Sequence, residues 1–319
     1  MKKYPIDNSA ILYLSLIRKH HTNIFRFTVT LTEPIQPELL QTAVNHVHHR
    51  FPTIFSGFRP GFFRYAQVPS EHPPVVQPDS GLLINMTPAE IARCAYRVYY
   101  LDKQIIIEGF HANTDGYGMI ASFSTLTAEY LHLQYGLDIP VGYPVFDIQE
   151  EPKTEETEDS YVTYSNAKPL HMPSRYSYQL PGMNPKCGPV IRETLMYPVE
   201  DLLSCARRYG VSITALLSAV MAASIMELQH NRKETKIRPV RIMVPIDLRK
   251  IFPSKTLRNF ILYALPTMET SQYGCSIRDL AHRFSQQIKA HLQRENLAGI
   301  IAYNVKTQRN PLFRVLPSR

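Results

Sequence analysis

Cysteine is scarce in this sequence. The 319 residues contain four cysteines, and none of them forms a CxxC pair or lies close to another. They are Cys94, Cys187, Cys205 and Cys275. This spacing argues against a zinc motif and against a disulfide framework. It fits reduced thiols in a cytoplasmic protein, which is the localisation that we expect.

Long apolar segments are also missing. Asp7 and Asn8 interrupt the apolar core that a signal peptide would need after the lysines at the N-terminus. The most apolar window, residues 211–226, contains several hydroxyl side chains and is shorter than the roughly 20 residues of a membrane span. We therefore expect no export signal and no membrane span, and we interpret this window as a buried helix.

The basic residues are not balanced by acidic ones, and the formal net charge is +8. Much of the positive charge lies between Arg232 and Arg258. No interleaved aromatic residues and no nucleic-acid-binding module accompany it, so nucleic acid is not expected as a partner. A solvated basic surface explains the cluster, and a positive rim that meets phosphate groups is the functional alternative.

Length and composition predict two folded lobes. A chain of 319 residues with 44% apolar and 19% charged residues is typical of a globular protein with two domains. Residues 138–190 are rich in proline and contain an acidic cluster from Glu150 to Asp159, a composition that favours little burial. We expect an N-terminal lobe over residues 1–137, an interdomain crossover over 138–190 and a C-terminal lobe over 191–319.

Hydrophobic periodicity predicts helices and strands in both lobes. The predicted helices cover residues 10–17, 37–50, 119–135, 199–209, 214–229 and 276–294. The predicted strands cover residues 23–31, two parts of 57–69, a hairpin of 94–102 and 104–110, and then 194–197, 238–245 and 260–268. Three histidines, His46, His48 and His49, end the second helix, but no cysteine or acid lies nearby in the sequence to complete a metal shell, so we predict no metal site.

The most informative segment is residues 105–118. Three successive isoleucines predict a buried strand, and the small polar residues after them predict a tight loop that enters a helix. His111 stands at the end of the strand, with Asp115 and Gly116 shortly after it. An imidazole that titrates near neutrality can take a proton from an attacking hydroxyl or amine. The structural alternative is that His111 ends the strand and Asp115 caps the helix that begins near Tyr117.

This segment resembles the HHxxxDG motif of the acyl-CoA-dependent acyltransferase superfamily, which includes chloramphenicol acetyltransferase, peptide-synthetase condensation domains and alcohol acetyltransferases. Phe110 replaces the first histidine, so HxxxDG is retained. Residues 244–260 resemble the stretch VPVNLRxxFPSxTxRNF of alcohol-acetyltransferase-like proteins. Further matching blocks at residues 4–8, 23–31, 37–40 and 50–52 occur in the order of that family, so the resemblance spans essentially the whole chain.

The resemblance implies an α/β fold of two chloramphenicol-acetyltransferase-like lobes, each a mixed sheet with helices packed on it, that meet across a channel. It implies transfer of an acyl group from acyl-CoA, as cosubstrate, to a small alcohol or amine acceptor, with His111 as general base and no bound cofactor. Asp115 and Gly116 are expected to be structural, with Asp115 paired to an arginine. Candidates for contact with the channel, the substrate, a phosphate or the motif loop are Asn113, Asn259, Arg249 and Arg258.

Family members continue past the point that residue 319 matches, so we expect the second lobe to be incomplete and to have an exposed sheet edge, through which the chain would self-associate. Two alternative functions stay open. One is a carrier-protein-dependent condensation that forms an amide, and the other is a truncated, non-catalytic binding protein.

Overall fold

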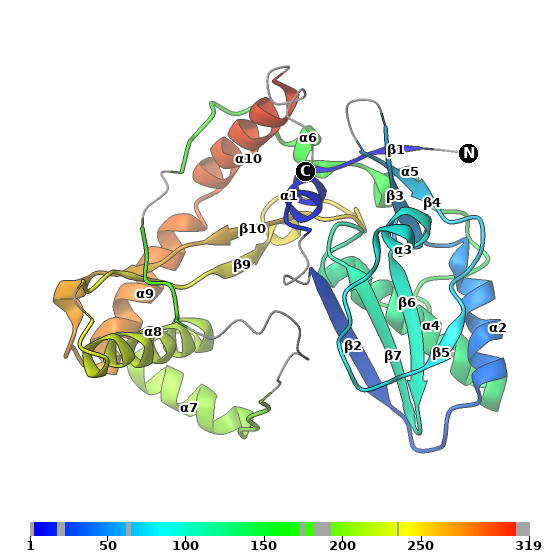
Figure 1. Cartoon of the computed structure of the whole chain (residues 1–319), viewed down its shortest axis with the longest axis horizontal. Coiled ribbons are helices and arrows are strands. Elements are labelled where there is room, and N and C mark those ends of the chain that lie inside the picture. Colours follow the sequence, from blue (N-terminus) through cyan, green and yellow to red (C-terminus); the bar gives the residue numbers. More distant parts are fainter. Residues whose placement is uncertain are drawn as a thin grey trace.

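A computed structural model describes residues 3–17, 23–61, 65–172, 176–181, 193–234 and 236–310. Two halves lie side by side (Figure 1). One half contains strands β1 to β7, and the other contains helices α7 to α10 with strands β8 to β11. Sheets with helices packed on them occur in both halves, which confirms the predicted α/β class.

A four-stranded sheet forms the centre of the first half. Its order is β2 (Ile24–Thr30), β7 (Gln104–Phe110), β6 (Tyr96–Leu101) and β5 (Val76–Pro78), and only β5 pairs in parallel with its neighbour. The isoleucines of β7 are buried, as the sequence predicts. The β6–β7 hairpin was also predicted, and its turn contains Asp102 in the left-handed region, with φ of 48°.

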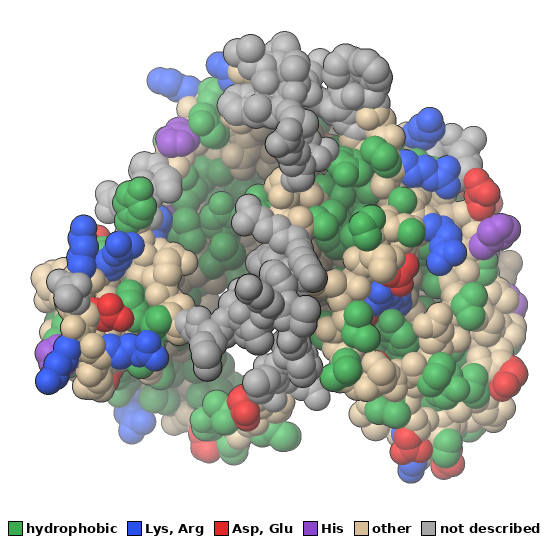
Figure 2. Space-filling model, viewed as in Figure 1, with side chains coloured by type: hydrophobic (Ala, Val, Ile, Leu, Met, Phe, Trp, Pro, Cys, Tyr) green, Lys and Arg blue, Asp and Glu red, His purple; other side chains and the backbone are tan. Residues whose placement is uncertain are grey.

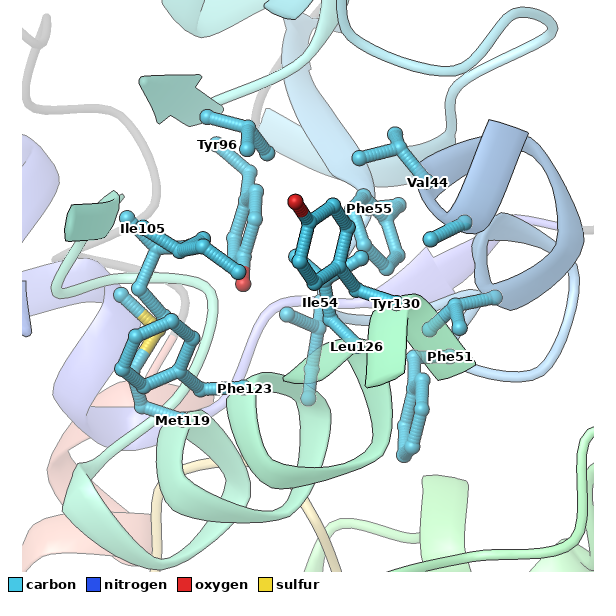
Figure 3. Close-up of a cluster of buried hydrophobic side chains, with 14 of the residues drawn as sticks. Val44, Phe51, Ile54, Phe55, Tyr96, Ile105, Met119, Phe123, Leu126 and Tyr130 are labelled. Carbon is cyan, nitrogen blue, oxygen red and sulfur yellow. The ribbon is translucent and has the colours of Figure 1, made fainter. Parts of the chain in front are cut away.

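Helices α2 (Pro37–His48) and α4 (Gly116–Tyr135) pack against each other and against one face of this sheet. Figure 3 shows the resulting core, in which Phe55, Tyr96 and Ile105 meet Met119 and Leu126. Fully burying a side chain of this size stabilises a fold by about 1.5–3 kcal/mol. This core fixes β7 and the start of α4, the two elements that flank His111.

A smaller sheet completes the first half. Its order is β1 (Tyr4–Pro5), β4 (Tyr65–Pro69) and β3 (Ser56–Pro60), and helices α1 (Asn8–Ser15) and α3 (Pro88–Arg93) accompany it. The predicted strand pair within 57–69 is confirmed, whereas Phe62, Phe63, His20 and His21 lie outside the described residues. Helix α3 was missed, although the Thr87 and Glu90 side chains form a capping box that is readable as Thr-Pro-x-Glu.

The second half contains two short antiparallel ribbons and four helices. The ribbons are β9 (Val244–Asp247) with β10 (Ile261–Ala264), and β8 (Val240–Arg241) with β11 (Thr267–Met268). The helices are α7 (Val199–Tyr209), α8 (Ile213–Asn231), α9 (Ile277–His291) and α10 (Arg294–Arg309), with single 3-10 turns η1 (Leu248–Lys250) and η2 (Thr270–Gln272). The predicted strands 238–245 and 260–268 are thus each divided, at a point where Pro266 has no N–H to donate.

Two further expectations for the second half are wrong. Residues 194–197 form no strand, and the Leu195, Met196 and Tyr197 side chains are exposed. Helix α8 is buried on one face only, since Leu217 and Met221 are about half exposed. With 19 residues, α8 is also the one helix in the described ranges that is long and apolar enough to cross a membrane, a test that core helices pass as well.

Residues 154–163 of the crossover are more ordered and more buried than their composition predicts. It contains the short helices α5 (Thr154–Thr157) and α6 (Ser160–Thr163). Glu156 in α5 accepts two hydrogen bonds from the buried guanidinium of Arg50, at 2.7 and 2.9 Å. Tyr161 in α6 is buried against Phe260 of the second half. The crossover therefore contacts both halves, and the boundaries at residues 137 and 190 stay a prediction.

Candidate active site

His111 lies directly after β7, where the two halves meet. Its backbone N–H donates to the Asn23 carbonyl at 2.8 Å, which extends the β2–β7 pairing by one step. The imidazole is only partly exposed. It stacks on the Tyr13 ring of α1, with centroids 4.3 Å apart and planes 17° apart, and it contacts the Phe25 ring of β2 at 4.6 Å with the planes tilted by 44°. Two aromatic rings thus hold the imidazole.

The surroundings of the imidazole favour its neutral form. Burial lowers the pKa of His111 below its ordinary value of 6.5, and the weaker influences of its own carbonyl, Asp115 and Asn259 oppose this shift. Nδ1 is buried and has no hydrogen-bond partner within the described residues. A neutral ring at physiological pH can accept a proton, as a general base must.

Phe110 occupies the place of the first histidine of the resembling motif. Successive strand residues point to opposite faces, so Phe110 points away from the side on which His111 lies. It is 2% exposed and packs on Phe58, with ring centroids 6.0 Å apart. The replacement therefore fills a hydrophobic core and leaves the imidazole untouched.

Asp115 accepts four hydrogen bonds. Oδ1 accepts from the N–H groups of Tyr117 and Gly118 and thereby caps α4. Oδ2 accepts from Nη1 of Arg249 at 2.9 Å and from the N–H of Phe260 at 2.8 Å. Asp115 is thus both a helix cap and the partner of an arginine, and its contacts to the second half fix the loop that carries His111.

The guanidinium of Arg249 is committed to this junction. Besides Asp115, it donates to Asp247, to the Thr256 carbonyl and to the Arg258 carbonyl, and it lies over the Tyr117 ring. Burial alone would lower the pKa of Arg249, but Asp115 and Asp247 raise it overall. Its predicted pairing with Asp115 is present, whereas its side chain is buried away from a phosphate in solution.

Arg258 does not pair with Asp115, which corrects that alternative. Its Nη2 donates to the Pro5 carbonyl at 2.6 Å and lies 3.4 Å from Oδ2 of Asp7. The side chain is buried. Arg258 therefore ties the second half to the N-terminal segment of the chain.

The two asparagine candidates are also buried and bonded to backbone. Nδ2 of Asn259 donates to the carbonyls of His111 and Ala112, at 3.0 and 3.2 Å. Nδ2 of Asn113 donates to the carbonyls of Ile54 and Ser56. Asn259 thus braces the motif loop, and the expectation that Asn113 contacts the channel is wrong.

Gly118, rather than Gly116, is the glycine that the packing requires. A Cβ atom at Gly118 would lie 2.2 Å from the Leu257 carbonyl oxygen, which also accepts a hydrogen bond from Thr114. A Cβ atom at Gly116 would meet nothing within 4 Å. The close approach at Gly118 brings the segment before β10 onto the start of α4.

These contacts place His111 at the seam of the two halves. Figure 2 shows a hollow lined with hydrophobic side chains between the halves. The sequence interpretation missed Tyr13 and Phe25, the rings that hold the imidazole. Phe25 reaches the imidazole because the pairing of β2 with β7 sets it opposite Gly109. Neither this pairing nor the position of Tyr13 can be read from the sequence.

The histidines at the end of α2 are engaged individually. His46 lies 2.6 Å from Glu129 of α4, an acid far away in the sequence, and His49 contacts the Ile148 carbonyl. Across the described ranges, no group of three or more His, Cys, Asp or Glu side chains is arranged to hold a metal ion.

Comparison with protein-family models and with curated protein sequences gives no match. Solved structures match over most of the chain. F. graminearum TRI101 complexed with coenzyme A and deoxynivalenol has a TM-score of 0.61 at 12% identity, over 98% of this chain and 79% of that one. The first condensation domain of the calcium-dependent antibiotic synthetase, in complex with a substrate analogue, has a TM-score of 0.58 at 14% identity, over 93% and 76%.

Polyketide synthase associated protein 5 from Mycobacterium tuberculosis matches with a TM-score of 0.57 at 16% identity, over 86% of this chain and 71% of that one. The chain has the fold of CoA-dependent acyltransferases and condensation domains. The predicted fold is therefore confirmed. At these identities the likeness establishes the acyltransferase fold alone, and the reaction is argued below from the site.

Proposed function

We propose that this protein transfers an acyl group from acyl-CoA to a hydroxyl or amine acceptor, with His111 as the general base. The observation that carries the proposal is the imidazole packed between Tyr13 and Phe25 at the seam of the two halves, where burial lowers its pKa. The coenzyme A bound in the TRI101 structure supports the choice of donor.

The chemistry follows from the position of the ring. Because Nδ1 is buried, we assign the hydrogen of the neutral ring to it, and Nε2 is then the nitrogen that accepts the proton of the acceptor as its oxygen or nitrogen attacks the thioester carbonyl. The tetrahedral intermediate then collapses, the C–S bond breaks, and the imidazolium returns the proton to the coenzyme A thiolate. A base positioned in this way contributes roughly 100- to 10,000-fold to the rate.

The direct test is release of the coenzyme A thiol from acetyl-CoA, with a panel of alcohols and amines as acceptors. His111→Ala should lower kcat/KM by roughly 100- to 10,000-fold. His46→Ala is the matched control, because His46 is a half-exposed histidine of the same half and should leave the rate unchanged. Equal rates for His111→Ala and the wild type would exclude the proposed base.

The pH profile tests the same ring independently. Because burial lowers the pKa of His111 below 6.5, kcat/KM should rise with pH and reach half of its maximum below pH 6.5. A half-maximal rate reached only above that pH would contradict a base whose neutral form is favoured by burial.

A carrier-dependent condensation is the second candidate, and the condensation domains among the matching structures favour it. It would use the same base to form an amide from a pantetheine-bound donor. Stimulation by an acyl-loaded carrier protein, with no turnover of free acetyl-CoA, would distinguish it. A non-catalytic binding protein predicts that His111→Ala changes no measurable activity.

A further inference from the structure

A cavity of about 460 Å³ lies in the first half, at the β5 edge of the four-stranded sheet. It arises because β5 pairs with β6 only from Val98 to Tyr100, so the preceding loop, residues 70–75, diverges from the beginning of β6. The end of α3 and the outer end of β3 close the space. His111, Asp115, Arg249 and Asn259 are not among the lining residues.

The loop that forms one wall is held in place. The Gln41 side chain of α2 donates to the Pro74 carbonyl at 3.2 Å and accepts from the Val76 N–H at 2.8 Å. Ser70 donates to the His72 carbonyl at 2.7 Å. The Gln41 side chain therefore ties the end of the loop to α2, and the Ser70 side chain stabilises the turn at its beginning.

Packing of β3 against α3 sets two arginines at this cavity. Gly57 allows the approach, since a Cβ atom there would lie 2.3 Å from the Ala92 carbonyl oxygen. Arg59 follows two residues along β3, on the same face as Gly57, and Arg93 is the last residue of α3. Both arginines line the cavity, and neither has an ion-pair partner within the described ranges.

Arg97, the third arginine that lines the cavity, is already paired with acidic side chains. Arg97 donates to Glu90 and to Glu108, at 2.8 and 3.1 Å, and its charge is compensated. Glu71 is the remaining acid of the lining, so the two unpaired arginines outnumber it. An anion that entered here would meet guanidinium groups, which bind carboxylate and phosphate through paired N–H donors.

The rest of the lining is largely apolar. Pro73, Pro74 and Val75 form one side, and Tyr96 and Val98 form the other. The volume falls within the range of pockets that hold small organic molecules. Cys94 also lines the cavity, but burial raises the pKa of its thiol to about 11, so the site is suited to binding and not to nucleophilic chemistry.

We propose that this cavity is a binding site for a small organic anion, a carboxylate or phosphate monoester on an apolar body, with Arg59 and Arg93 as its charge-recognising residues. The site is separate from the His111 site and independent of the proposed acyl transfer.

The test is ligand-observed NMR titration of the whole protein with phenyl phosphate and benzoate as probes and benzyl alcohol as the uncharged analogue. At least one of the two anions should bind saturably and more tightly than benzyl alcohol. The double variant Arg59→Gln, Arg93→Gln should weaken anion binding at least about tenfold, since each hydrogen bond to a charged group contributes about 1.5–3 kcal/mol. Arg207→Gln, Arg283→Gln is the control, because these arginines are exposed in the second half.

Labelling of Cys94 gives a second readout that reports the place of binding. The bound anion should slow alkylation of Cys94 in the wild type, and leave Cys205 and Cys275 unaffected. His111→Ala should bind the probes as the wild type does. Three results would overturn the proposal: no saturable binding of either anion, equal weakening in the control variant, or loss of binding in His111→Ala.

Discussion

His111 and Asp115 are four residues apart in one motif, and they are held by different kinds of contact: Asp115 by hydrogen bonds and His111 by aromatic rings. Asp115 accepts four hydrogen bonds, two of them from the second half. The imidazole of His111 is packed against two rings, the stacked Tyr13 and the tilted Phe25, and its Nδ1 has no hydrogen-bond partner within the described residues. The motif thus consists of a hydrogen-bonded frame at the acid and a ring that is positioned by aromatic packing.

This difference shows that separate residues hold the two halves together and surround the imidazole. The hydrogen bonds that join the halves involve Asp115, Thr114 and Asn259, whose side chains are buried. These residues fix the backbone of the motif loop, whereas the ring of His111 is positioned by its contacts with Tyr13 and Phe25. Substitutions at the hydrogen-bonded residues of the junction and at the rings around the imidazole should therefore have different effects.

The largest effect is expected for Asp115→Ala. The change leaves the buried Arg249 with less compensation and removes the cap of α4, so it should lower the free energy of unfolding by about 3–5 kcal/mol. Urea denaturation measures this. Glu155→Ala is the control, because it breaks an exposed ion pair with Lys255 that is worth at most about 1 kcal/mol. A similar decrease in the free energy of unfolding in both variants would contradict the structural role assigned to Asp115.

Asp7 is a buried acid with fewer hydrogen-bond partners than Asp115. Burial raises the pKa of Asp7 to about 7, with Arg258 acting against the shift. The folded protein therefore binds more protons than the unfolded chain between about pH 4 and pH 7, and stability falls as the pH rises through this window. Each pKa unit corresponds to roughly 1.4 kcal/mol.

Asp7→Asn removes this titration and retains an oxygen that can accept from the Ala10 N–H, as Asp7 does. The unfolding free energy of the variant should therefore fall less than that of the wild type between pH 5 and pH 8. Asp138→Asn, an exposed position, should follow the wild type. A wild-type slope in Asp7→Asn would show that another group titrates.

An intermediate effect is expected for Asn259→Ala. It removes the two donors that brace the carbonyls of His111 and Ala112, and each buried acceptor left unpaired costs about 1–3 kcal/mol. Denaturation gives the stability change, and the thiol-release assay should show a lower kcat because the motif loop is less fixed. Asn296→Ala, on the exposed side of α10, should stay within about 0.5 kcal/mol.

The smallest effect is expected at Tyr13. Tyr13→Phe preserves the stacked ring and should behave as the wild type, whereas Tyr13→Leu should lose about 0.5–1.5 kcal/mol of stacking. The loss should appear in kcat together with a changed pH profile, which a purely structural role would not alter. Equal kinetics of the Phe and Leu variants would show that stacking does not hold the imidazole.

Much of this outcome was accessible from the sequence. The isoleucine run predicted β7, Gly136 predicted the end of α4, and the helix over 199–209 has the predicted bounds. These features depend on local periodicity and on backbone preferences of single residues. Residues 194–197 show the limit, because a short run of apolar residues also occurs in an exposed segment that pairs with no strand of the described residues.

For the candidate site too, features set by neighbours along the chain were predicted, and several features set by distant segments were not. The order of HxxxDG places His111 after a strand and Asp115 at the start of a helix, and both were predicted. Contact of Asn259 with the motif loop was one of the predicted alternatives, whereas the roles of Asn113 and Arg258 were not predicted, since each depends on which backbone carbonyl lies opposite its side chain. The crossover was misjudged for a related reason: Glu156 is buried because Arg50, distant in the sequence, compensates its charge.

By itself, the amino-acid order determined which segments form helices and strands, and it placed an imidazole at the end of a buried strand, because these properties arise from neighbours along the chain. Only the tertiary structure decided that Tyr13 and Phe25 enclose that imidazole, that Arg249 belongs to Asp115, and that Arg59 meets Arg93 at a cavity. Each of these depends on the packing of segments that are far apart in sequence, and the charge and burial of a side chain follow from that packing.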